Sequence, residues 1–332
     1  MSSQNNDRKI TFAKAVNEAI CEEMERDDKV IVFGEDVAVA GGVWKVTEGI
    51  LDQFGPDRIL DTPISELGIA GLGVGAAMTG LRPIVEIMFG DFLPLASDQI
   101  VNQAAKTFYM SGGETMAPMV FLTSMGAGRR LGAQHSQSLH SWFAHIPGLK
   151  VVLPSSTYDA KCLMKTAIRD NNPVVFIQDK VEIHQKGPVP DPTHEYTIPF
   201  GQAKVKREGT DLTLIATSSM VPEALAAATE LAEDGIEAEV IDPRTLSPLD
   251  EKTLIDSVRK TSRCITIDEG YRRYGAGAEI TALIAEQAFY DLEAPVRRIG
   301  AMDVPVPFAP SLEDLTIPGK KQILEIARQM FE

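Results

Sequence analysis

The sequence predicts an α/β protein of two doubly wound domains. Helix-like and strand-like patterns alternate along both halves of the chain, and the strand-like runs are short, apolar and rich in β-branched residues, as is typical of parallel strands covered by helices on both faces. A length of 332 residues is enough for about two domains. Hydrophobic residues make up 44% and charged residues 24% of the chain, which excludes a disordered or fibrous protein.

The first half begins with a helix followed by a buried strand. Thr11 is expected to cap a helix through AKAVNEAICEEMER, and KVIVFGED follows as the strand. A glycine-spaced helix comes after the turn DTPISE. Later runs in this half have the composition of further strands, RPIVEIMF, MVFLTS, LKVVLP and PVVFIQD, and of further helices, DQIVNQAAKTFYM and STYDAKCLMKTAIRDN.

A proline-rich stretch predicts where one domain ends. Residues 184–199 contain four prolines and almost no apolar periodicity, as expected of a linker. We therefore expect domains at 1–185 and 200–332, joined by a linker at 186–199. The second domain repeats the alternation, with strands at DLTLIATS, IEAEVIDP and CITIDEG, a helix from about Pro222 to Asp234 stopped by Gly235, and a helix around LDEKTLIDSVRK.

The charge of −15 counts against a nucleic-acid partner, because a duplex backbone requires a basic face. The acid excess runs through both halves, with 25 acidic and 15 basic residues in 191–332. Three scattered cysteines, Cys21, Cys162 and Cys264, indicate reduced thiols. The most apolar stretch, IAGLGVGAAMTGL, is too short to span a bilayer. These features predict a cytoplasmic protein with no membrane segment.

Several familiar site signatures do not match. GIAGLGVGAA lacks the G-x-G-x-x-G order of a dinucleotide-binding turn. His135, His140 and His145 recur every five residues, which does not place two metal ligands on one helix face. Gly68, Gly71 and Gly75 share a helix face instead, and this spacing favours a close packing interface over chance composition.

Longer segments carry a resemblance to a known family. VIVFGEDV, DTPISELGIAGLGVGAAMTGLRPIVEIMFGDF, AQHSQSLHSWFAHIPGLKVV and IDEGYRRYGAGAEI resemble the β subunit of the thiamine-diphosphate-dependent first component of pyruvate, acetoin and branched-chain 2-oxo acid dehydrogenase complexes. The resemblance runs in order through essentially the whole chain. It implies a transketolase-like pyrimidine-binding domain followed by a transketolase C-terminal-like domain that serves assembly and acyltransferase docking.

The resemblance implies three site residues. Glu66, in TPISELG, matches the family's carboxylate that binds the pyrimidine N1′ of the cofactor and promotes loss of the thiazolium proton; on spacing alone it would only help to cap a helix. Phe92, in FGDF, matches an aromatic residue that packs on the aminopyrimidine ring. His135, in AQHSQS, matches an active-site histidine that donates a proton to the substrate oxygen or stabilises it. Glu35, in FGED, is a weaker candidate for an acid near the cofactor.

The resemblance also implies a potassium site, and it implies that the part of the active site that binds the diphosphate lies on another chain. Asp170 and Asn172, in IRDNNP, match a loop that binds potassium in some members; a plain helix-ending turn stopped by Pro173 explains them equally well. The G-D-G motif that holds the diphosphate through magnesium is absent from this chain, and the family carries it on the α subunit. The chain is therefore expected to share thiamine diphosphate with an α subunit and to be inactive alone.

The expected function is that of a β subunit in a heterotetramer of two α and two β chains, of pyruvate or acetoin type. Such an enzyme cleaves its substrate to a two-carbon thiazolium adduct and transfers the unit to lipoyl groups of a partner acyltransferase. The alternatives are a branched-chain 2-oxo acid enzyme, a single-chain transketolase-type enzyme, against which the missing diphosphate half argues, and a non-catalytic assembly subunit of the same fold.

Overall fold

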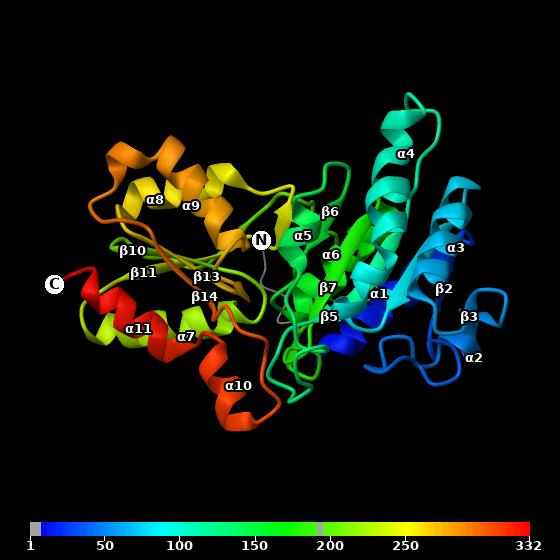
Figure 1. Ribbon diagram of the computed structural model, residues 1–332, viewed down its shortest axis with the longest axis horizontal. Helices are drawn as coiled ribbons and strands as arrows, with labels where there is room; N and C mark the ends of the chain where they lie inside the picture. Colours follow the sequence, from blue (N-terminus) through cyan, green and yellow to red (C-terminus); the bar gives the residue numbers. More distant parts are fainter. Residues whose placement is uncertain (1–7, 191–194) are drawn as a thin grey trace. The chain divides into compact units, whose positions relative to one another are not determined.

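The computed structural model describes residues 8–190 and 195–332 and divides the chain into two compact units. The first unit comprises Met1–Met125 and Trp142–Phe200, and the second comprises Gly126–Ser141 and Gly201–Glu332. Each unit is an α/β fold with its own sheet (Figure 1). The predicted fold class is confirmed.

Six parallel strands form the sheet of the first unit. In spatial order they are β6 (Lys150–Val152), β7 (Val174–Asp179), β5 (Val120–Met125), β4 (Arg82–Ile87), β2 (Val30–Gly34) and β3 (Ile59–Asp61). Val32 pairs with Ile84, which in turn pairs with Val120. Strands β4, β5 and β7 are buried almost throughout because helices cover both faces of the sheet.

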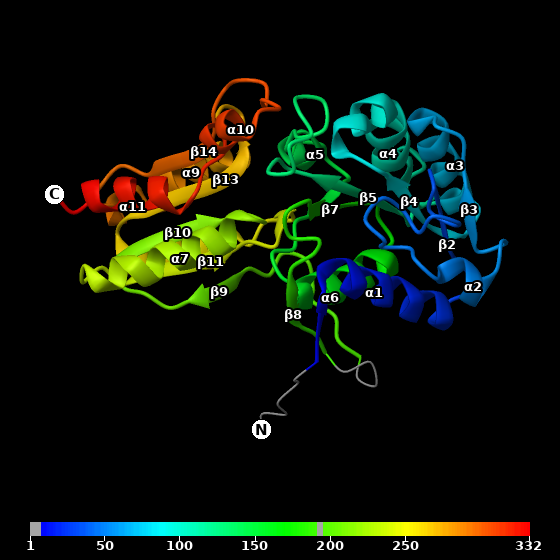
Figure 2. The ribbon, with the colours of Figure 1, turned by 90° about the horizontal axis from the view of Figure 1, so that it is seen from below.

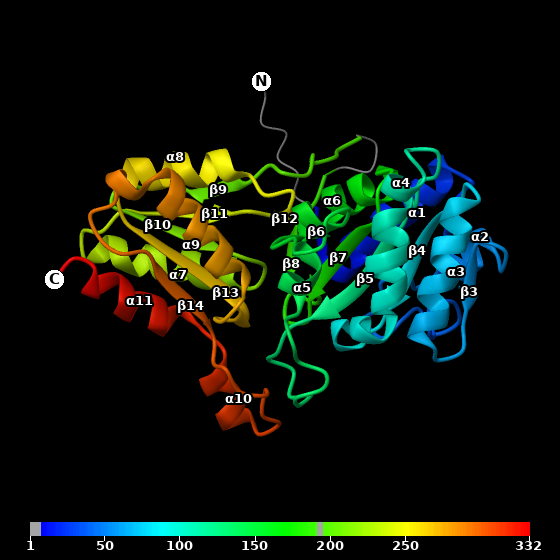
Figure 3. The ribbon, with the colours of Figure 1, turned by 45° about the horizontal axis from the view of Figure 1, so that its top comes forward.

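Helices lie on both faces of this sheet. In Figure 2, α1 (Phe12–Arg26) and α6 (Thr157–Arg169) lie on one side of the strands, and α3 (Glu66–Met78) and α4 (Ala105–Met110) lie on the other. Figure 3 shows α3 and α4 on their common face. As predicted, the Thr11 side chain caps α1 by accepting from the Lys14 amide. The remaining short elements are α2 (Ile50–Phe54), the 3-10 helix η1 (Gly90–Ala96), the π-helical turn η2 (Gln99–Ala104) and α5 (His140–Ala144).

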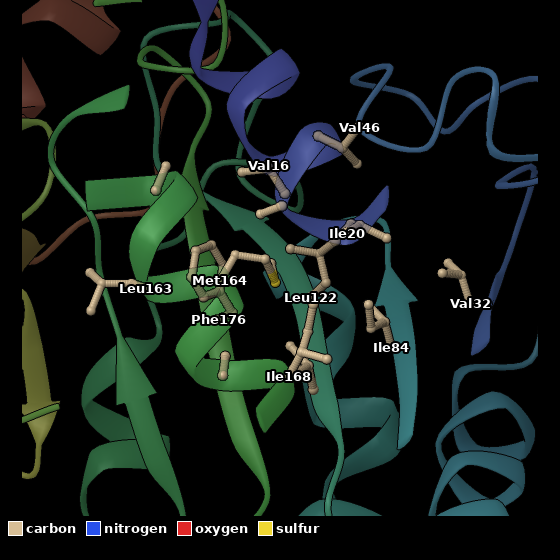
Figure 4. Packing of buried hydrophobic residues seen from close by; sticks show 14 of the residues in the cluster. Val16, Ile20, Val32, Val46, Ile84, Leu122, Leu163, Met164, Ile168 and Phe176 are labelled. Carbon is tan, nitrogen blue, oxygen red and sulfur yellow. The ribbon is translucent and has the colours of Figure 1, made fainter. Parts of the chain in front are cut away.

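The core of the first unit lies between its sheet and the pair α1 and α6. Figure 4 shows Val16 and Ile20 of α1 and Met164 of α6 beside Leu122 and Phe176 of the strands. All five side chains are fully buried. Burying a residue of this size contributes about 1.5–3 kcal/mol to stability.

Part of the predicted linker is structured. Strand β8 (Lys186–Pro188) pairs antiparallel with β1 (Lys9–Thr11), and Ile198 packs into the core of the first unit. Two-stranded pairing tolerates proline because each strand keeps a free edge. Residues 191–194 of the predicted linker lie outside the described part. The segment 126–141, expected within the first domain, groups with the second unit.

The second unit is a five-stranded sheet with helices on both faces. Its spatial order is β14 (Arg297–Ala301), β13 (Cys264–Tyr271), β10 (Leu212–Ala216), β11 (Ala238–Asp242) and β9 (Lys204–Arg207), parallel except for β9. Figure 1 shows α8 (Glu251–Thr261) and α9 (Ala276–Gln287) on one face, and α7 (Met220–Glu233) and α11 (Lys320–Gln329) on the other. As expected, α7 ends before Gly235, whose φ is 81°. The unit also contains β12 (Thr245–Ser247), η3 (Phe289–Asp291) and α10 (Pro310–Thr316).

The cysteines agree with the prediction of reduced thiols, since Cys21, Cys162 and Cys264 are all free. Across residues 8–190 and 195–332, none of the helices combines the length and apolarity that a bilayer crossing requires.

Candidate functional site

The candidate site of the first unit lies at the carboxyl ends of its strands. The connection after β2 leads to β3 at one edge of the sheet, whereas the connection after β4 leads to β5 on the other side. Open parallel sheets bind ligands at such a divergence. Glu35 directly follows β2, and the segment Phe89–Phe92 begins two residues after β4 ends. The divergence therefore brings an acid and an aromatic segment to the same edge of the sheet.

Glu66 is the half-buried first residue of α3. Ser65 before it makes no side-chain capping hydrogen bond, and a carboxylate at the first turn is favoured by the helix dipole. Burial, Asp36 and Glu66, in that order, raise the pKa of Glu35. Glu66 and Glu35 are thus close enough to repel each other, and a group that donates a proton or a hydrogen bond here would relieve that repulsion.

Phe92 belongs to a series of aromatic rings in contact. It meets Phe89 edge-to-face at 5.9 Å between ring centroids, and Phe89 meets Trp44 in the same manner at 6.2 Å. Trp44 Nε1 donates to Ser124 Oγ at 2.7 Å, and that hydroxyl donates to the Met88 carbonyl at 2.8 Å. The half-buried Phe92 ring therefore rests on a fixed aromatic support, which suits stacking against a flat ligand.

A buried ion pair that sequence reasoning missed lies beside Phe92. Lys180 Nζ is 3.6 Å from Asp91 Oδ2, and neither side chain is more than 1% exposed. The same ammonium group lies 5.0 Å from the centre of the Phe89 ring. In the sequence, the charged residues Asp91, in FGDF, and Lys180, at the end of PVVFIQDK, were the features that could have indicated this pair. Breaking a buried ion pair is costly in free energy. The Lys180–Asp91 pair therefore stabilises the position of the backbone at the neighbouring residue, Phe92.

Glu86, in β4, is a second buried carboxyl group that the sequence did not single out. Burial raises its pKa to about 8, so it is mostly protonated at neutral pH. Its Oε2 atom has no hydrogen-bond partner in the part of the chain that the structure describes. A Cβ atom on Gly42, whose φ is 70°, would lie only 3.1 Å from that oxygen. The loop after β2 therefore packs directly on an uncharged carboxyl.

His135 belongs to the second unit, within Gly126–Ser141. It is half-buried, and its amide donates to the Gly132 carbonyl at 3.3 Å. Glu66 and Phe92 belong to the first unit. The three predicted site residues are therefore divided between the units, and their shared role stays a prediction.

The predicted cation loop is occupied by protein cations. Lys150 binds the Asp170 carboxylate, whose other oxygen accepts from the Asn172 backbone and side-chain nitrogens. The Arg82 guanidinium donates to the carbonyls of Ile168 and Asp170 at 3.0 Å. These contacts agree with the helix-ending turn and draw on the oxygens that a potassium ion would use.

The glycine face of α3 is largely uncovered by the described residues, so the packing interface expected there stays a prediction. Gly73 makes the close approach inside the unit, because a Cβ there would lie 2.5 Å from Val85 and 2.7 Å from Met119. By contrast, a Cβ on Gly75 would meet nothing within 4 Å among the described residues. The expected face is instead apolar and exposed, with Leu67, Leu72 and Met78 about half-exposed. A helix that is apolar on every side is typical of burial in an assembly.

The aromatic and carboxylate side chains of the first unit suit the ring portion of a ligand. An aromatic face and paired carboxylates fit a flat heteroaromatic ring with a nitrogen that can carry a proton. Among residues 8–190 and 195–332, no cluster of three or more His, Cys, Asp or Glu is placed to hold a metal ion.

Comparison with known proteins covers almost the whole chain. Residues 8–185 match the family model "Transketolase, pyrimidine binding domain" and residues 201–323 match "Transketolase, C-terminal domain". The chain is 49% identical to the pyruvate dehydrogenase E1 component subunit beta of Rickettsia felis, over 97% of this chain and 98% of that one. It is 48% identical to the acetoin:2,6-dichlorophenolindophenol oxidoreductase subunit beta of Bacillus subtilis, over 98% of each. A solved structure titled "Split gene transketolase, inactive beta4 tetramer" has the same fold, with a TM-score of 0.79 at 21% identity over 97% of this chain and 98% of that one.

Proposed function

Because the chain belongs to the family of transketolase-like β subunits of pyruvate and acetoin dehydrogenase components, we propose that it holds the aminopyrimidine end of thiamine diphosphate in a dehydrogenase first component. The observation that carries the proposal is the placement of Glu35 directly after β2 and of Glu66 at the start of α3, where the charge of Glu66 helps to raise the pKa of Glu35. Paired carboxylates of this kind favour a partner that brings a proton.

Each site residue has a distinct task in this proposal. When bound, thiamine diphosphate would supply a carbon nucleophile for the substrate carbonyl. Glu66 would hold a proton at the pyrimidine N1′, which promotes the imino form of the ring. Phe92 would stack on the same ring and fix its plane. His135 would donate a proton to the substrate oxygen or stabilise it, since an imidazole serves either role near neutrality.

A second chain would supply the diphosphate half. No G-D-G motif occurs in the sequence, so magnesium would be held by an α subunit. The exposed apolar face of α3, with Leu67, Leu72 and Met78, supports burial against such a partner. We propose a heterotetramer of two α and two β chains that is active only when both are present.

Transfer to a lipoyl-bearing acyltransferase would follow cleavage. Residues 191–332 carry 25 acidic against 15 basic residues, which favours a basic docking module. We expect its association rate to fall as salt is raised from 50 to 300 mM. An association rate that does not change with salt would remove the electrostatic argument for docking on this unit.

The test of the proposed function uses the chain purified together with its α partner. Release of carbon dioxide or acetaldehyde from pyruvate, acetoin and 3-methyl-2-oxobutanoate would be measured with an artificial electron acceptor. We expect turnover of pyruvate or acetoin. Turnover of the branched substrate alone would favour the branched-chain alternative. Unchanged turnover in Glu66→Gln would favour the non-catalytic assembly subunit.

Two smaller assignments belong to the same proposal. A potassium ion at Asp170 and Asn172 would share the loop with Lys150 and Arg82, so replacing potassium chloride by tetramethylammonium chloride should lower the melting temperature of the complex. An unchanged melting temperature would leave the helix-ending turn as the explanation.

A cytoplasmic location fits three free cysteines.

A further inference from the structure

One carboxylate in the second unit holds both ends of the loop that carries His135. Glu269 Oε1 accepts from the Ala127 amide at 2.7 Å, and Oε2 accepts from the Ser138 hydroxyl at 3.4 Å. The loop is also closed on itself where the Gly126 amide donates to the Gln137 carbonyl at 3.3 Å. Glu269 is buried in β13. Its two oxygens therefore fix the start and the end of a segment that is otherwise irregular.

The neighbouring residue in β13 makes a second attachment just beyond the loop. His140 Nε2 lies 3.0 Å from Asp268 Oδ2, and Asp268 Oδ1 accepts from the Thr217 hydroxyl at 2.8 Å. Burial would raise the pKa of Asp268, but His140, Thr217 and the Gly270 amide together lower it below its usual range. A Cβ on Gly270 would lie 3.1 Å from His140 Cε1. This close fit leaves His140 little room to move.

A third attachment comes from α10. Glu313 Oε1 accepts from the Gly128 amide at 2.8 Å and from the Arg130 amide at 3.3 Å. Its other oxygen pairs with the Arg130 guanidinium, which also binds Asp314 at 2.6 Å. The Glu313 side chain is fully buried. Three buried acids therefore receive donors from the segment that carries His135.

We propose that Glu269 and Asp268 are positioning residues that hold the His135 loop in its working conformation. This inference rests on the proposed function of His135, and it gives the second unit a role in the reaction beyond assembly and docking. A loop held only by its own backbone bond would sample many conformations, and misplacement of a reacting group by about 1 Å costs on the order of a hundredfold in rate.

A purely structural role would have a different signature. If these acids only stabilised the second unit, replacing them would act like replacing any other buried carboxylate of that unit. Glu239 in β11 offers the matched control: it is buried and paired with Lys260, and among the described residues its side chain interacts with Lys260, Ser257 and Glu208, all outside the loop. The inference therefore predicts effects confined to the loop for Glu269→Gln and Asp268→Asn.

The first measurement uses the chain alone and needs neither cofactor nor partner. Hydrogen exchange followed by mass spectrometry would be compared for the peptide covering 126–141 in the wild type, Glu269→Gln, Asp268→Asn and Glu239→Gln. Carbethoxylation of His135 by diethyl pyrocarbonate would be timed in the same samples. We expect exchange and carbethoxylation to speed up about tenfold or more in the first two variants and to remain unchanged in Glu239→Gln.

The second measurement uses the complex with the α partner. Glu269→Gln and Asp268→Asn should lower kcat about ten- to a hundredfold while leaving the affinity for thiamine diphosphate unchanged, because Glu66 and Phe92 are intact. If His135→Ala lowers turnover but the two variants match Glu239→Gln in exchange and in kcat, the inference is overturned and the proposed function stands. If His135→Ala leaves turnover unchanged, the proposed role of His135 fails, and the positioning role fails with it.

Discussion

The protonated state of Glu86 gives a stability prediction that depends on pH. The pKa of this buried carboxyl rises from an ordinary 4.5 to about 8. Between these values the folded chain keeps a proton that the unfolded chain releases, so stability falls as pH rises. Since one pKa unit corresponds to ~1.4 kcal/mol, the loss is about 5 kcal/mol over the whole window and about 2–3 kcal/mol between pH 6 and pH 8.5.

Glu86→Gln removes the titration while keeping the shape of the neutral side chain. We therefore expect the stability of the variant relative to the wild type to rise by about 2–3 kcal/mol between pH 6 and pH 8.5, a relative shift of about 5–10 °C in melting temperature. Tryptophan fluorescence reports the transition in the relevant unit, because both tryptophans, Trp44 and Trp142, belong to the first unit.

Glu23 supplies the matched control for this experiment. It is a buried carboxylate of the same unit, but it is paired with Arg26 and Arg169. Glu23→Gln should therefore destabilise the unit by about 3–5 kcal/mol at both pH values. A constant difference between Glu86→Gln and the wild type from pH 6 to pH 8.5 would refute the reasoning, because it would mean that Glu86 does not titrate in this range.

Three further variants test the edge of the first unit. Lys180→Met should lower the unfolding free energy by about 3–5 kcal/mol in urea titrations, with much of the loss restored by adding Asp91→Leu; equal stability of Lys180→Met and wild type would argue against a buried ion pair. Glu66→Gln should abolish turnover in the complex with assembly unchanged by gel filtration, and retained turnover would contradict its proton-holding role. Phe92→Ala should weaken thiamine diphosphate binding about tenfold by calorimetry; unchanged affinity would rule out stacking.

Short-range sequence patterns, such as capping residues and apolar runs, predicted most of the longer helices and strands. Thr11 caps α1 and Ser156 caps α6, each through its side chain. The apolar runs that predicted the strands became the parallel strands of both sheets. These features depend on neighbours a few residues apart, and such neighbours are visible in the sequence.

Features that join distant segments could not be predicted. Asp91 and Lys180 lie far apart in the chain, and only the folded sheet makes them an ion pair. The same holds for Glu269, which meets a loop more than 130 residues earlier. The sequence singled out Gly68, Gly71 and Gly75 by spacing, yet Gly73 makes the close contact, since strand β4 decides which helix face is covered.

Calorimetric titration of thiamine diphosphate with magnesium tests the central claim most directly. The chain by itself should show no tight binding, and the same chain mixed with its α partner should bind the cofactor and begin turnover. Tight binding together with turnover by the purified single chain would contradict the account, because the account assigns the magnesium diphosphate to the α partner.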